Sequence, residues 1–330
     1  FPVIDIFAGP GGLGEGFAAL EDKNEKPVFK SLPSIERDEF AHKTLLLRHF
    51  YRAFSKHCVP TEYYQYIKGE IGLNDLKRQY PEEWRTAQST AHKISLGFDS
   101  HDKVKKIIDR KLDGHSKWVL VGGPPCQAYS LVGRSRRAND PHFHKDEKHF
   151  LYKEYLKIII DHEPPVFVME NVKGLLSAKV NGKPVLSKII NDLSKPKNAV
   201  GRSDNGLSYK LYSLSKNGDL NEESDLSAFL VKAEEYGVPQ ARHRMFIVGI
   251  RADIDVLPNV LKKKPSPTVK NIIGNLPKIR SGVSKEKDSF NKWQSIIQKA
   301  YDKKWLQKIS DHSILIKMKL LEEKFSNKVM

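Results

Sequence analysis

The segment that begins at Gly122 constrains the fold more than any other part of the chain. It reads Gly-Gly-Pro-Pro-Cys-Gln-Ala-Tyr-Ser and follows the apolar run Trp118–Val121. Such a run predicts a buried strand of a parallel sheet, and the glycines and prolines prevent that strand from continuing. The chain must therefore turn at the carboxyl edge of the sheet, where ligands bind in open α/β folds. Cys126 lies on this turn and is a candidate nucleophile.

The alternative interpretation of Cys126 is a small, buried hydrophobic residue, which is the commoner role of a single cysteine. Packing alone does not require two glycines and two prolines before a thiol, so the turn favours the functional interpretation. The chain has 2 cysteines, Cys58 and Cys126, which suits a reducing compartment and does not suggest a disulfide framework.

The amino-terminal segment has the pattern of a nucleotide-binding unit. An apolar run over 2–7 predicts a strand, a glycine-rich turn follows over 8–14, and the spacing of Phe17 and Leu20 predicts a helix over 13–20. Glycines let a ligand approach the backbone, and a helix amino terminus offers free N–H groups. A further strand over 28–35 ends at Glu36, whose carboxylate could accept hydrogen bonds from ribose hydroxyls. A solvated surface glutamate is the alternative.

The middle of the chain continues the alternation of helices and strands. Glu170 follows an expected strand over 166–169, so a second acidic residue should lie at the same sheet edge as Cys126. Arg242 and Arg244 alternate, so on an extended segment their guanidinium groups face the same way and could hold an anion or a carbonyl oxygen. Helices are expected over 39–50, 101–112, 150–162 and 185–193, and further strands over 209–214, 229–233 and 245–250.

The composition changes after residue 255, where prolines and lysines replace the regular alternation. We therefore expect an α/β domain over 1–255, with a helical insertion at about 51–98, and a second region over 256–330. The domain boundary should fall between 255 and 280, and the lysine-rich tail from residue 290 should be helical.

The formal net charge is +16, which favours a polyanionic partner such as nucleic acid, although basic proteins can carry such charge for solubility alone. The loop over 133–141 is long and basic. Together with Ser130, its arginines Arg134, Arg136 and Arg137 suit phosphate contacts, and a solvated run of charge is the alternative. No apolar run approaches the ~18 residues of a membrane span, and no secretory signal opens the chain.

Four separated stretches resemble the motifs of the cytosine-C5 DNA methyltransferase family. They are 5–12 (Asp-Ile-Phe-Ala-Gly-Pro-Gly-Gly), 124–127 (Pro-Pro-Cys-Gln), 170–172 (Glu-Asn-Val) and 240–244 (Gln-Ala-Arg-His-Arg). The resemblance covers about residues 1–250. It implies a Rossmann-like, S-adenosylmethionine-dependent methyltransferase sheet with a smaller target-recognition domain, only partly present here, and no metal. The residues that match the family's cofactor site are Phe7, Gly9, Gly11, Gly12, Leu13, Glu36, Arg37 and Pro124.

The same resemblance implies methyl transfer to C5 of cytosine in duplex DNA, with S-adenosylhomocysteine as the product. Cys126 would attack C6 of a base flipped out of the duplex, and Glu170 would hydrogen-bond or protonate N3. Arg242 would hold the base carbonyl oxygen or orient Glu170, and Arg244 would support the catalytic loop, the base or a phosphate. Ser130, Arg134, Arg136 and Arg137 would contact DNA. Bacterial members act beside a restriction endonuclease of the same specificity, in the cytoplasm.

The chain departs from the family pattern in two places. No clean copy of the adenine-contacting Gly-Asp-Ile is found; Gly69–Ile71 and Gly97–Asp99 are near-matches, which leaves Glu70 and Asp99 as alternatives. The family's closing Arg-Glu and Gly-Asn-x-Val segments are also not found. We therefore expect that those segments lie outside the given sequence or on another chain, and that this chain is not active by itself.

Three other functions are compatible with parts of the sequence. An RNA cytosine methyltransferase, with transfer RNA as substrate, would use the same catalytic core. A catalytically inactive nucleic-acid-binding homologue would explain the missing segments. A nicotinamide-dependent dehydrogenase would explain the glycine-rich turn but would leave Cys126, Glu170 and the two arginines without a role.

Overall fold

The structure is a computed structural model that describes residues 1–125, 148–180, 182–201, 206–221, 225–277 and 279–326. The chain divides into two compact units, Phe1–Thr268 and Val269–Met330, each considered by itself below. The division falls inside the interval 255–280 where the composition changes. The assignment of the second region to target recognition stays a prediction.

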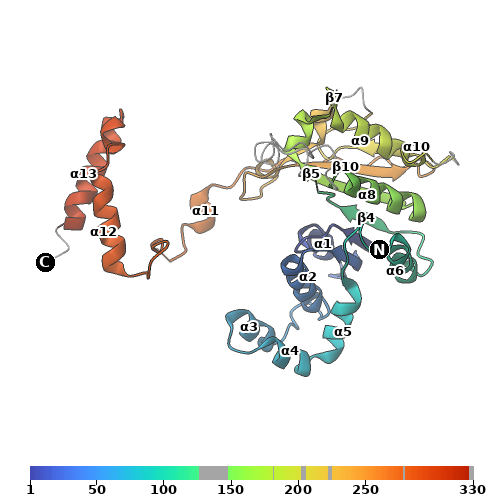
Figure 1. The fold of residues 1–330 in the computed structure, drawn as a ribbon, viewed down its shortest axis with the longest axis horizontal. Helices are drawn as coiled ribbons and strands as arrows, with labels where there is room; N and C mark the ends of the chain where they lie inside the picture. Colours follow the sequence, from blue (N-terminus) through green and yellow to red (C-terminus); the bar gives the residue numbers. More distant parts are fainter. Residues whose placement is uncertain (126–147, 181, 202–205, 222–224, 278, 327–330) are drawn as a thin grey trace. The chain divides into compact units, whose positions relative to one another are not determined.

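The first unit is built on one mixed sheet, of which β4, β5 and β10 are labelled in Figure 1. The strand order is β3-β2-β1-β4-β5-β10-β8, with β9 also paired to β10. The neighbouring strands β3, β2, β1, β4 and β5 are all parallel to one another. The strand β10 runs antiparallel to β5, β8 and β9. This confirms the expected Rossmann-like α/β class. The strands are β1 (Pro2–Ile6), β2 (Lys30–Glu36), β3 (Ala91–Lys93), β4 (Val119–Gly122), β5 (Val166–Val172), β8 (Tyr209–Tyr212), β9 (Leu230–Lys232) and β10 (His243–Arg251).

Helices cover both faces of this sheet, as the alternating side chains of β1 show. Ile4 and Ile6 belong to the main hydrophobic core together with residues of α6 and α8. Asp5 points to the opposite face, where its carboxylate accepts a hydrogen bond from Gly14 N in α1. Right-handed parallel crossovers produce this two-sided arrangement. The helices concerned are α1 (Gly12–Ala18), α2 (Glu39–Arg52), α6 (His101–Leu112), α8 (Lys148–His162), α9 (Val185–Ser194) and α10 (Pro196–Ala199).

The insertion after α2 contains the helices α3 (Thr61–Lys68), α4 (Leu73–Gln79) and α5 (Pro81–Thr90). Phe50 of α2 and Trp84 of α5 form its small core with surrounding tyrosines, so these aromatic residues are local core. The expected range of 51–98 was wrong at its end, because residues 91–93 form β3, the edge strand of the main sheet. Their Ala-His-Lys sequence carries no apolar run that would predict a strand.

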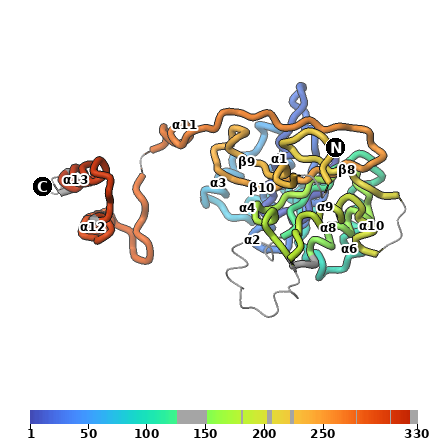
Figure 2. Tube along the Cα trace, turned by 90° about the horizontal axis from the view of Figure 1, so that it is seen from above, coloured from blue at the N-terminus to red at the C-terminus, as the bar shows by residue number. Residues whose placement is uncertain are grey.

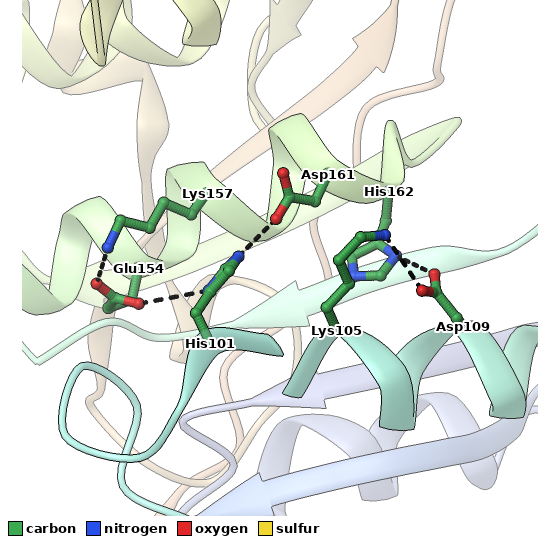
Figure 3. Close-up of polar contacts among 7 residues, drawn as sticks. All are labelled: His101, Lys105, Asp109, Glu154, Lys157, Asp161 and His162. Atoms are coloured by element: carbon green, nitrogen blue, oxygen red, sulfur yellow. Dashed lines mark hydrogen bonds and ion pairs between the residues drawn. The ribbon is translucent and has the colours of Figure 1, made fainter. Parts of the chain in front are cut away.

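Two histidine–carboxylate contacts join α6 to α8 (Figure 3). His101 lies between Glu154 and Asp161, with Nε2 2.5 Å from Asp161 Oδ2 and Nδ1 3.8 Å from Glu154 Oε2. His162 Nδ1 lies 3.1 Å from Asp109 Oδ1. Because both contacts are partly shielded from solvent, they fix α8 against α6.

The pairing of β5 with β10 brings together residues far apart in the sequence. Phe167 stands opposite Gly249, and a Cβ at Gly249 would lie 2.1 Å from the Phe167 ring, so the ring occupies the space that the glycine leaves. Glu170 stands opposite Phe246 within β5, which extends to Val172. The expectation that the strand ends at residue 169 was therefore wrong, and Glu170 is a strand residue that pairs with β10.

The carboxyl-terminal unit contains α11 (Val269–Ile273), α12 (Phe290–Tyr301) and α13 (His312–Ser326), which confirms the expected helical tail (Figure 2). A short hairpin, β6 (Lys179–Val180) with β7 (Lys183–Pro184), follows β5 in the first unit. Among the described residues, no helix combines the length and apolar character that crossing a membrane would require.

Candidate active site

The glycine turn, residues 7–12, leaves β1 in an unusual backbone conformation. Phe7, Gly9 and Gly11 all have positive φ, at 57°, 57° and 88°. Glycine adopts this region freely, whereas Phe7 does so at a cost of about 1 kcal/mol or more. Ala8 N donates to Ile35 O at 3.0 Å, and Gly11 forms the amino-terminal cap of α1. Strained residues of this kind cluster at ligand sites.

Glu36 at the end of β2 organises the glycine turn from the neighbouring strand. Its Oε2 accepts a hydrogen bond from Gly9 N at 2.7 Å, and its Oε1 accepts one from Asp38 N at 2.6 Å. Both carboxylate oxygens keep further lone pairs for other donors. Glu36 therefore couples the turn after β1 to the end of β2, in addition to any contact with a ligand.

A cavity of about 290 Å³ opens at the carboxyl edge of the parallel strands. Of the residues expected to bind the cofactor, Phe7, Glu36 and Arg37 line it, and Pro124 lies between the lining residues Gly123 and Pro125. Gly9, Gly11, Gly12 and Leu13 shape the adjoining turn instead and are not among the lining residues. The lining residues that the sequence did not single out for the cofactor are Ile35, Asp38, Ile94, Leu96, Gly123, Pro125 and Leu151.

The segment that follows β3 supplies part of the wall of this cavity through Ile94 and Leu96. Asp99 follows on the same segment, and its Oδ2 accepts a hydrogen bond from Ser95 N at 2.6 Å. Glu70 instead lies at the carboxyl end of α3, outside the cavity lining. Of the two near-matches, the segment of Asp99 is the one next to the cavity. The sequence gives no pattern that predicts this part of the wall, because the strand before it, β3, is only 3 residues long.

Glu170 and Arg244 form an ion pair across the antiparallel strands β5 and β10. Arg244 Nε lies 2.9 Å from Glu170 Oε1. Burial raises the pKa of Glu170, and the positive charges of Arg244 and Arg242 oppose that rise. The structure thus brings Glu170, which the sequence placed at this edge, close to the two arginines that the family resemblance assigned to the same site. It gives Arg244 the direct contact with Glu170, whereas Arg242 is more exposed and acts on Glu170 only through its charge.

The proline turn, residues 123–125, passes next to this ion pair. A Cβ at Gly123 would lie 3.0 Å from Glu170 Oε2, so the strand end and the carboxylate are in contact. On the other face of β5, Asn171 Nδ2 donates a hydrogen bond to Pro124 O at 3.2 Å. Asn171 was not expected to have a role beyond its membership of the Glu-Asn-Val motif.

Cys126 follows Pro125 directly in the chain and lies outside the described residues, as do Ser130, Arg134, Arg136 and Arg137. Their expected roles stay predictions. Within the described ranges, no group of three or more His, Cys, Asp or Glu side chains is placed so that it could hold a metal ion.

A mainly parallel sheet with a glycine turn, an acidic residue ending β2, and an acid–arginine pair at its carboxyl edge is the arrangement of a Rossmann-like methyltransferase fold. The model of the C-5 cytosine-specific DNA methylase family matches residues 80–327, so the chain belongs to that family.

Several similar curated proteins are type II methyltransferases. M.Bpa9945I from Bacillus paralicheniformis is 27% identical over 300 residues, which cover 84% of this chain and 61% of that protein. M.BspRI from Lysinibacillus sphaericus is 31% identical, over 84% of this chain and 52% of its own length. M.DdeI from Desulfomicrobium norvegicum is 24% identical, over 90% of this chain and 54% of its own length. The chain thus spans a little over half the length of these relatives.

Proposed function

We propose that this chain carries the catalytic part of an enzyme that transfers a methyl group from S-adenosylmethionine to C5 of cytosine in duplex DNA. The observation that carries the proposal is the Glu170–Arg244 ion pair beside the proline turn that leads to Cys126. An acid with a raised pKa, next to the strand that delivers a nucleophile, is what addition to a pyrimidine ring requires.

The residues around the cavity fit S-adenosylmethionine. Phe7 and the apolar wall of Ile94 and Leu96 suit a flat adenine ring, and the carboxylate of Glu36 suits ribose hydroxyls. The glycine turn leaves room for the methionine part near the amino terminus of α1. When bound, S-adenosylmethionine supplies an electrophilic methyl group, and S-adenosylhomocysteine leaves.

The reaction would begin with a bond between the Cys126 thiolate and C6 of the target cytosine. Glu170 holds the N3 position and donates a proton there, so that negative charge does not build up on the ring and C5 becomes nucleophilic. Arg244 fixes the carboxyl group of Glu170 through the 2.9 Å contact, and Arg242 is free to hold the base carbonyl oxygen. After C5 is methylated, a base removes the C5 proton and the thiolate leaves C6.

The target base would have to leave the duplex, at a cost of a few kcal/mol. Phosphate contacts by Ser130, Arg134, Arg136 and Arg137, and the net charge of +16, would offset this cost. Residues 256–330 would begin the target-recognition part. Because the similar proteins are type II methyltransferases, the expected setting is the bacterial cytoplasm, where methylation protects DNA from a restriction endonuclease of the same specificity.

The test is a covalent trap. DNA that contains 5-fluorocytosine is incubated with the protein and S-adenosylmethionine and run on a denaturing gel. Fluorine at C5 cannot leave as a proton, so a reacting Cys126 stays attached to DNA, and the band should be absent in Cys126→Ala. The proposal fails if S-adenosylmethionine binds and no adduct forms with either DNA or transfer RNA. An adduct with transfer RNA alone would assign the enzyme to RNA.

A further inference from the structure

The two prolines of the proline turn limit the hydrogen bonds that its backbone can form. The ladder between β4 and β5 ends with the pair Gly122 and Met169. Beyond it, Pro124 and Pro125 carry no amide hydrogen, so these two residues cannot donate to β5 as residues of a continuing strand would. Only carbonyl oxygens of these prolines remain for an attachment, and they need a donor from elsewhere.

Asn171 supplies that donor. Its side chain is buried, with 6% of its surface exposed, and Nδ2 donates to Pro124 O at 3.2 Å. Its Oδ1 accepts a hydrogen bond from Val172 N at 2.8 Å, which fixes the orientation of the amide. The amide group therefore adds a hydrogen bond to the Pro124 carbonyl and attaches the turn to β5 beyond the last backbone pair of β4 and β5.

We propose that Asn171 is a positioning residue that holds the proline turn, and through it the attachment point of Cys126, at the edge of the sheet. Glu170 and Asn171 are neighbours in β5 and point to opposite faces. The strand β5 thus places Glu170 on one face and holds the proline turn through Asn171 on the other. The distance between Glu170 and the proline turn is therefore set by β5. This inference rests on the proposed function for its meaning in catalysis.

The chain contains a matched control at the other end of β5. Pro164 and Pro165 form a second pair of prolines, and the buried Tyr209 hydroxyl donates to Pro164 O at 3.0 Å. This bond has the same chemistry as the one from Asn171, a side-chain donor to the carbonyl of the first proline. It lies away from the cavity, so Tyr209→Phe removes an equivalent bond without touching the proline turn.

The experiment compares Asn171→Ala, Asn171→Asp and Tyr209→Phe in a Cys58→Ser background, which leaves Cys126 as the one thiol. Methyl transfer is measured with radiolabelled S-adenosylmethionine and unmethylated DNA, and thiol accessibility by the rate of alkylation with iodoacetamide. We expect both Asn171 variants to lower kcat by roughly 30-fold or more, with KM for S-adenosylmethionine changed less than about 3-fold. Cys126 alkylation should change at least about 3-fold, and Tyr209→Phe should alter neither quantity.

Each outcome decides the proposal. Equal loss of kcat in Asn171→Ala and Tyr209→Phe would show a general effect of stability and overturn it, as would unchanged kcat and alkylation in the Asn171 variants. If the unsubstituted protein transfers no methyl group, the proposed function fails, while the alkylation rates still test whether Asn171 holds the turn. Urea unfolding of all variants establishes that each one is folded.

Discussion

The backbone of Gly123 lies against the carboxylate of Glu170, so closely that a methyl group at residue 123 would stand 3.0 Å from Oε2 and 3.4 Å from the Glu170 carbonyl oxygen. The end of β4 and the proposed acid are therefore in direct contact. Any side chain at residue 123 must move one of them.

Gly123→Ala should consequently lower kcat by about 10- to 100-fold, because small displacements of a catalytic group are costly. Gly16→Ala is the matched control: a Cβ there meets nothing within 4 Å, and alanine favours the helix. Steady-state kinetics with both variants checks the expectation. A Gly123→Ala enzyme as active as the Gly16→Ala enzyme would contradict it.

Arg244→Gln should lower the maximal rate and move the alkaline limb of the pH–rate profile to higher pH. Arg244 lowers the pKa of Glu170 against the effect of burial, so its removal raises that pKa further. An enzyme whose catalytic acid must be protonated loses activity as the pH rises through the pKa of that acid. A higher pKa of Glu170 therefore moves the alkaline limb to higher pH. Arg242→Gln should move the same limb less, because Arg242 makes no direct contact with Glu170. The pH dependence of kcat/KM measures both, and a shift to lower pH would refute this assignment.

Asp5→Asn should stabilise the protein at and above neutral pH. Burial raises the pKa of Asp5 to about 7 in the folded chain from an ordinary value of 3.8. The folded state therefore binds the proton more tightly than the unfolded state, and stability is lost as pH rises from about 4 through about 7. The stability gained by the variant should grow over that window and then stay constant, at roughly 4 kcal/mol as an upper limit.

Urea unfolding at several pH values measures this difference. His49, which shares the small cavity with Asp5, provides a test of opposite sign, because burial lowers its pKa to about 4. His49→Gln should relieve a loss of stability that appears as pH falls below about 6.5. A flat pH dependence of the Asp5→Asn difference would show that folding does not raise the pKa of Asp5 and would contradict this expectation.

His101→Ala should destabilise the first unit by about 1–3 kcal/mol, because it removes the group between the buried carboxylates of Glu154 and Asp161 (Figure 3). Lys105→Ala, in the same helix, breaks a more exposed pair with Asp109 and should cost less than about 0.5 kcal/mol. Denaturant unfolding compares the two, and equal effects would mean that the contact between α6 and α8 does not depend on His101.

The sequence predicts the regular parts of this fold well, because periodic apolar residues dominate there. The helix expected over 101–112 has those bounds in the structure, and Leu151, Tyr155, Ile158 and Ile159 form the buried face of α8 as expected. The strand β3 escaped prediction because 3 residues with one buried side chain show no period. Local patterns cannot reveal a strand whose place is decided by its neighbour β2.

The residues of the candidate site that belong to sequence motifs could be predicted. The residues that reach the site through packing between distant segments could not. Glu170 could be placed at the sheet edge and the arginines could be assigned to the same site by their motif, but which arginine contacts Glu170 depends on the register of β10 against β5. The roles of Ile94 and Leu96 in the cavity wall, and of Asn171 beneath the proline turn, arise from contacts between distant segments. Such contacts leave no local signal in a single sequence.

The ring of Phe167 over Gly249 has a consequence for how this chain can vary. It marks one register between β5 and β10, and a slip of a single residue would send Arg244 to the face opposite Glu170. Inserting or deleting one residue between 244 and 249 should therefore be far more harmful than most substitutions there. Natural variants should therefore keep the number of residues between 244 and 249 more strictly than they keep the residue types there.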